Sequence, residues 1–172
     1  MEIINAILYQ FRTISLPWWI VIGTVSVLLL IFRHKREQLV GNVLIIFILV
    51  ILISTVLSRF PVSFSERSEL INLNLIKTWR ERLSGDFYGK SELLLNFCML
   101  LPIGVLFPWA TQKGFFPTVL SGFVLILIIE LAQLFTGRGW LELSDIVDNT
   151  IGVVIGYLLY RIGKAIWRKI RC

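Results

Sequence analysis

Five apolar segments divide the chain, and each is long enough, or nearly long enough, to cross a bilayer as a helix. A spanning helix needs about 20 predominantly apolar residues because the hydrocarbon core is about 30 Å thick. The segments cover residues 16–32, 39–57, 93–110, 115–135 and 146–160. Every backbone N–H and C=O inside a bilayer must be bonded internally, so segments of this kind form helices. The sequence therefore predicts an all-α integral membrane protein with about five transmembrane helices.

The composition agrees with this class and argues against a nucleic-acid-binding protein. Hydrophobic residues make up 56% of the chain and charged residues only 16%, whereas soluble domains are about a quarter charged. The net charge is +6, but most basic residues flank apolar segments, where they set membrane orientation. A single histidine and two cysteines also disfavour a zinc site, which usually takes several such ligands.

Two dense basic groups predict the orientation. One lies between the first two segments and the other in the C-terminal tail: Arg33, Lys35 and Arg36, then Arg161, Lys164, Arg168, Lys169 and Arg171. With five spans both groups fall on one side, which is cytoplasmic by the positive-inside rule. The N-terminus is then outside and the C-terminus cytoplasmic. Residues 1–38 form the N-terminal tail, first helix and basic loop, residues 39–160 the membrane domain with an extracellular loop at 58–92, and residues 161–172 a basic tail.

Polar side chains gather at one predicted depth, near the outer membrane face. Glu130 lies about 7–8 Å below the outer end of the fourth helix at 1.5 Å per residue. Asp145 and Asn149 lie in the first turns of the fifth helix, and Asn96 lies one turn into the third. An ionisable group at the centre of a spanning helix costs roughly 2.5–3.5 kcal/mol on insertion scales, so such groups pair, face a wet cavity or have a function.

We therefore predict a polar pocket with the ligand-binding residues Asn96, Glu130, Gln133, Arg138, Asp145 and Asn149. Asp145 fits equally well as a cap of the fifth helix, and Arg138 as the partner of a structural ion pair. Carboxylates with an amide are also ligands for Mg²⁺ or Ca²⁺ or groups for acid–base catalysis. The chain has no nucleophile elbow and no phosphate-binding loop, so whether it is an enzyme stays open.

Segment 58–92 is predicted to be an outer loop with partial structure. Residues 71–75 alternate apolar and polar side chains, which indicates an extended or re-entrant piece. Trp79 suits the headgroup level, where aromatic rings are enriched. The interpretation is an interfacial loop beside the pocket.

Over roughly residues 40–160, the sequence resembles the VanZ-like family of small bacterial membrane proteins. The third segment carries Asn96-Phe97 and Pro102-Ile103-Gly104, the fourth Glu130, Gln133 and then Arg138, and the fifth Asp145-Ile146, Asn149-Thr150-Ile151-Gly152 and Gly156. Residues 72–76 match the family's stretch before the third helix without its proline. Asp148 is an acid beyond the usual pattern.

The resemblance implies a multi-pass protein of the bacterial cell membrane with a role at the envelope. The family is named for an accessory protein that raises tolerance to teicoplanin, and the name supplies no reaction. We expect an outward polar pocket that binds a lipid-linked cell-wall precursor or a lipoglycopeptide, with membrane lipids as further partners and no cofactor. The alternatives are a metal- or carboxylate-assisted enzyme on a lipid-linked substrate, or a structural partner of cell-wall enzymes that uses the Gly152/Gly156 face.

Overall fold

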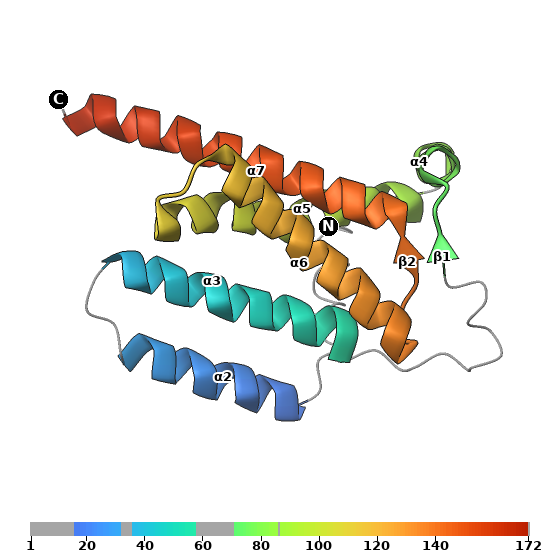
Figure 1. Ribbon diagram of the computed structural model, residues 1–172, viewed down its shortest axis with the longest axis horizontal. Helices are drawn as coiled ribbons and strands as arrows, with labels where there is room; N and C mark the ends of the chain where they lie inside the picture. The colour runs from blue at the N-terminus through green and yellow to red at the C-terminus, as the bar shows by residue number, and fades with distance from the viewer. Residues whose placement is uncertain (1–15, 32–35, 58–70, 86, 172) are drawn as a thin grey trace.

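A computed structural model describes residues 16–31, 36–57, 71–85 and 87–171, and nearly all of them are helical (Figure 1). The helices are α2 (Leu16–Ile31), α3 (Arg36–Leu52), the π-helix η1 (Ile53–Leu57), α4 (Leu75–Ser84), α5 (Phe87–Thr111), α6 (Phe115–Thr136) and α7 (Leu143–Arg171). Strands β1 (Ile71–Asn72) and β2 (Leu141–Glu142) are two residues each. The predicted tail at residues 1–15 and part of the predicted outer loop, residues 58–70, lie outside the described residues.

The helices confirm an all-α membrane protein. Four of them are long and apolar enough to cross a bilayer: Gln38–Leu57, Gly89–Thr111, Phe115–Thr136 and Leu143–Ile170. Helix α2 has a shorter apolar stretch, Pro17–Leu29. Large apolar side chains such as Phe116, Leu120 and Ile128 on α6 are 82%, 61% and 53% exposed, which suits a surface that faces lipid rather than water. The count of five spans and the orientation stay predictions.

Two helices are longer than the apolar pattern predicts. Helix α5 begins at Phe87, six residues before the predicted third span, because Gly89 to Glu92 are polar or small and still fit the helix. Helix α7 runs to Arg171, so the described part of the predicted basic tail continues the last spanning helix. Arginine and lysine are good helix formers, and Arg161 donates a hydrogen bond to the Tyr157 hydroxyl one turn earlier, at 3.2 Å.

Helices α5 and α7 form the most extensive contact in the described molecule, and glycines make it possible. A Cβ atom at Gly152 would collide with the carbonyl oxygen of Phe97, and one at Gly156 with that of Leu101. In the other direction, a Cβ at Gly104 would collide with the carbonyl oxygen of Val153. Such small residues allow helix backbones to touch inside a bilayer. The Gly152/Gly156 face is covered by α5, which removes the surface that the structural-partner alternative needed.

The segment before α5 is more ordered than the predicted loop. Strand β1 pairs in parallel with β2, with Ile71 opposite Leu141 and Asn72 opposite Glu142. The Asn74 side chain then caps α4 by accepting from the Lys77 N–H at 3.1 Å, as Asn commonly does at a helix start. The predicted extended piece is therefore only two residues long, and helix α4 follows it.

The chain direction brings four helix ends together. The end of η1, the start of α5, the end of α6 and the start of α7 lie at the same end of the bundle as β1, β2 and α4 (Figure 1). The α5–α6 turn and the C-terminal end of α7 lie at the opposite end. Apolar side chains fill the middle, with Leu100, Ile126 and Val153 fully buried. The polar residues of α5, α6 and α7 are thereby placed around one end of the core.

Candidate functional site

Arg82 of α4 is the centre of a cluster of carboxylates. Its guanidinium lies 3.0 Å from Glu142 and from Asp145, 3.2 Å from Asp148 and 3.3 Å from Glu92. The Arg82 side chain is only 6% exposed. A planar guanidinium with five N–H donors suits several carboxylates at once, and it joins α4 to β2, α5 and α7.

The charges and burial of this cluster raise the pKa of two groups that lie outside the spanning segments, Arg82 and Glu142. Burial opposes the charge of Arg82, but attraction from Asp145, Glu92 and Glu142 outweighs it, so the pKa of the guanidinium is raised. Burial, followed by repulsion from Asp145, raises the pKa of the Glu142 carboxyl above its ordinary value, while Arg82 opposes that rise. The site thus holds more negative charge than its one cation balances.

A second side chain of α4, Trp79, contacts α7. The Trp79 indole Nε1–H donates to Asp148 Oδ1 at 2.9 Å, and Asp148 is 0% exposed. Thr78 and Arg82, four residues apart on α4, are the buried positions of that helix among its described side chains. Trp79 thus makes a specific contact with the extra acid, Asp148, and its position at the membrane interface stays a prediction.

A cavity of about 600 Å³ lies beside this cluster. Its lining includes five of the six predicted site residues: Asn96, Glu130, Gln133, Asp145 and Asn149. Glu92, Trp140 and Glu142 also line it, and these were not predicted. The structure therefore brings polar residues from four spanning segments and from β2 to one shared space.

Hydrogen bonds hold most of these side chains in place. The Asn96 amide donates to Asp145 Oδ1 at 2.7 Å. Glu130 Oε2 accepts from the Glu142 backbone N–H at 3.0 Å, which explains how a carboxylate at 2% exposure is accommodated in α6. The Asn149 amide nitrogen donates to the Asp145 carbonyl oxygen at 2.8 Å.

One buried polar atom in the cavity wall is left without a partner. Asn149 is 0% exposed, and its Oδ1 accepts no hydrogen bond from the part of the chain that the structure describes. An unsatisfied buried acceptor costs about 1–3 kcal/mol. Such an atom beside a polar cavity is a ready acceptor for a bound molecule.

Gln133 and Arg138 stabilise the end of α3 and η1. The π-helical turn Ile53–Leu57 ends that span, and its last carbonyls have no partner within the helix. Gln133 Nε2 donates to the Thr55 carbonyl at 3.1 Å, and Arg138 donates to the Leu57 carbonyl at 2.7 Å. A cation at a helix C-terminus is favourable.

The geometry gives Arg138 a role different from the predicted one. It does not line the cavity, and among the described residues its guanidinium contacts backbone carbonyls. The countercharge of the acidic cluster is Arg82 instead. Gly137, in the left-handed conformation with φ 63°, ends α6 and directs Arg138 toward η1.

The carboxylates do not fit the alternative of a bound Mg²⁺ or Ca²⁺. Within the described ranges, no group of three or more His, Cys, Asp or Glu side chains is arranged to hold a metal ion. The oxygens of Glu142, Asp145 and Asp148 converge on Arg82. A guanidinium thus occupies the position that a cation would take.

Arg82 is the main residue that sequence reasoning missed. It lies in a segment without an apolar span, among six other charged residues from position 77 to position 92. The available signal was Trp79 followed by Arg82 at helical spacing, beside Thr78 on the same face.

Comparison with known proteins identifies the family of the chain. A family model described as VanZ/LLP1 matches residues 39–164. This region contains η1, α4, α5, α6 and most of α7, and with them every residue of the cavity wall. No curated protein and no solved structure matches the chain. The family match covers more than half of the sequence, and the chain belongs to the VanZ/LLP1 family.

Proposed function

We propose that the 600 Å³ cavity binds the polar part of a lipid-linked envelope component or of a lipoglycopeptide of the teicoplanin type. The observation that carries the proposal is Asn149 Oδ1, a buried acceptor without a partner among the described residues. A ligand that donates a hydrogen bond to this atom recovers the cost of burying it. The cavity lies at a membrane end of the bundle, within reach of a molecule anchored in the bilayer.

The chemistry of the wall selects a donor-rich ligand. Glu130, Glu142, Asp145 and the Asn149 oxygen all present acceptors, and ionised carboxylates accept without donating. Hydroxyl, amide and ammonium groups match such a wall. The sugar and peptide parts of cell-wall precursors and of glycopeptides are rich in these groups. Trp140 adds an apolar surface that suits the face of a sugar ring.

A phosphate is a poorer fit to the same wall. The cation of the cluster, Arg82, is shared among four carboxylates, so it has little capacity left for an anion. Arg138, the other predicted clamp, bonds to the end of η1. Because the carboxylates pair with Arg82, they also give no support to the alternative of a metal-assisted enzyme. The proposal therefore concerns recognition of a sugar–peptide group.

Binding to protein in lipid nanodiscs tests the proposal, with teicoplanin and a lipid-linked cell-wall precursor as separate probes. The Asn149→Ala protein should bind at least one probe about tenfold more weakly than wild type, the value of one buried hydrogen bond. Asn42→Ala is the matched control, because Asn42 donates to the Leu29 carbonyl away from the cavity. Equal affinity of wild type and Asn149→Ala for both probes would contradict the proposal.

A further inference from the structure

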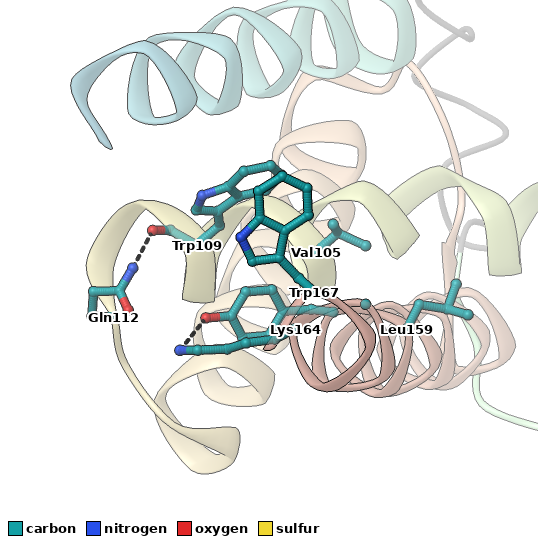
Figure 2. Close-up of a pocket in the computed structure, with 8 residues that line it drawn as sticks. Val105, Trp109, Gln112, Leu159, Lys164 and Trp167 are labelled. Carbon is teal, nitrogen blue, oxygen red and sulfur yellow. Dashed lines mark hydrogen bonds between the residues drawn. The ribbon is translucent and has the colours of Figure 1, made fainter. Parts of the chain in front are cut away.

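A second cavity lies at the opposite end of the bundle from the polar site. It has a volume of about 450 Å³ and is formed by the end of α5 and the C-terminal half of α7 (Figure 2). Trp109 from α5 and Trp167 from α7 both stand at its wall. None of the residues of the polar site lines it.

Its position in the fold fixes its depth in the membrane. One span ends at Thr111 and the next begins at Phe115, so the short link between them lies at the membrane surface. Val105, six residues before Thr111, is then about 9 Å deeper. The inner wall, with Val105 and Leu159, is apolar, whereas Gln112 and Lys164 at the surface end are polar. This gradient matches an amphiphile with its headgroup at the surface.

Lys164 provides a cation at the polar rim. Its Nζ donates to the Tyr160 hydroxyl at 3.0 Å and lies 5.3 Å from the centre of that ring. An ammonium group has three N–H donors, and the structure gives Lys164 one hydrogen bond. The Gln112 amide bonds the Trp109 carbonyl at 2.8 Å, so the rim is held in shape (Figure 2).

A neighbouring hollow of about 350 Å³ shares this rim and adds further positive charge. It is lined by Lys113, Arg161 and Arg168 together with Lys164. The chain carries no acidic residue between Glu92 and Glu130 and none after Asp148. Positive charge at the α5–α6 link and on the last turns of α7 is thus not neutralised from within these stretches.

We propose that the Trp109–Trp167 cavity binds one anionic glycerophospholipid from the leaflet on the side of the C-terminal end. The lipid phosphate lies at Lys164, within the field of Lys113, Arg161 and Arg168. An acyl chain passes Trp109 and continues inward along Val105 and Leu159, while Trp167 stands beside the headgroup. Basic pockets beside spanning helices recognise anionic headgroups in this way. Tryptophans that only mark the membrane interface do not require a cavity. Here α5 and α7 form a concave wall around the two tryptophans, with the charged residue at its surface end.

Native mass spectrometry of the full-length protein in detergent, with phosphatidylglycerol and phosphatidylcholine titrated separately, tests this site. Wild type should retain phosphatidylglycerol more tightly than phosphatidylcholine. Lys164→Gln should weaken phosphatidylglycerol binding about fivefold, the value of one basic residue near a lipid surface. Trp167→Leu should weaken it as well, because the lipid loses an indole wall.

Lys169→Gln is the matched control, since it removes the same charge from the same helix but lines neither hollow. It should change affinity less than twofold, about a third of the Lys164 effect in free energy. Equal losses in Lys164→Gln and Lys169→Gln would overturn the site in favour of unspecific attraction to the basic tail. Equal retention of the two lipids by wild type would also overturn it, as would full competition by soluble glycerol phosphate, which lacks the acyl chains.

Discussion

Arg82 and Asp148 form an ion pair across 66 residues of sequence, with Arg82 Nη1 donating to Asp148 Oδ2 at 3.2 Å. Asp148 is 0% exposed and Arg82 is 6% exposed. The pair attaches α4, which is not a spanning helix, to the start of the longest one, α7. Because each charge is buried, each requires the other, and the polar end of the bundle depends on this attachment.

Removing Arg82 should therefore destabilise the protein strongly. The Arg82→Gln change leaves several carboxylates close together without a cation, and breaking a buried pair in this way costs about 3–5 kcal/mol. We expect a lower melting temperature in detergent and lower membrane abundance. Combining Arg82→Gln with Asp148→Asn should recover part of the loss, because one uncompensated charge is gone.

Arg80→Gln is the control for this prediction, since Arg80 is an exposed arginine on the same helix. Its melting temperature should stay close to that of wild type, as exposed charges contribute little. If Arg80→Gln and Arg82→Gln have the same melting temperature, the carboxylate cluster does not depend on Arg82.

The sequence predicted the spanning helices well because a long apolar run has few alternatives in a bilayer. It also predicted that Asn96, Glu130 and Asn149 share a depth, since alternating helix direction follows from short connections. All three line one cavity, and the close approach of α5 and α7 at Gly104, Gly152 and Gly156 brings Asn96 and Asn149 together. Their role in binding a ligand stays a prediction.

Sequence reasoning missed Arg82 and the β1–β2 pair for a physical reason. Both are long-range contacts of a polar segment, in which no apolar periodicity marks a buried face. Arg138 was expected to bind the ligand or to form a structural ion pair. The left-handed Gly137 instead turns it toward Leu57. The arginine that pairs with the carboxylates is Arg82, because the turn at Gly137 directs Arg138 away from them.

The glycine contact between α5 and α7 gives a second prediction. Gly152→Ala places a methyl group against the Phe97 carbonyl oxygen, and overpacking of this kind costs about 1–3 kcal/mol. Gly163→Ala is the matched change on the same helix, where no atom lies within 4 Å of the new Cβ. Thermal unfolding in detergent should show Gly152→Ala below wild type and Gly163→Ala at or above it, because alanine favours the helix. The reverse order would show that the helices are not in backbone contact.

Glu142 gives a prediction about pH. Its pKa is raised in the folded protein from the ordinary value of 4.5, mainly by burial and then by Asp145, so the folded state holds this proton more tightly than the unfolded state. Stability is then greatest below that ordinary value and falls as pH rises through the folded pKa. Glu142→Gln lacks this titration, and the wild type should lose melting temperature relative to it as pH increases over that window. A difference that stays constant with pH would show that Glu142 titrates normally.

Membrane orientation is predicted by the basic groups and is open to direct measurement. Reporter fusions at residue 35 and at the C-terminus should both give a cytoplasmic signal, because lysine and arginine accumulate in cytoplasmic loops. A fusion in the α5–α6 link, at Lys113, should agree with them. An external signal from the C-terminal fusion would move the polar cavity to the cytoplasmic face and exclude an extracellular ligand.

The polar cavity itself is tested by conservative changes that keep the fold. Glu130→Gln retains the shape and an acceptor for the Glu142 N–H but removes a charge from the cavity wall, so a donor-rich ligand loses an ionic partner. Asn149→Asp adds a negative charge beside Asp145, which disturbs the wall by repulsion. Both should abolish the envelope phenotype, with teicoplanin tolerance measured first, at normal membrane abundance. Glu81→Gln, the same change at an exposed glutamate paired with Lys77, should leave tolerance intact. Full activity of both cavity variants would make the cavity a structural feature and direct attention to the surface of α4.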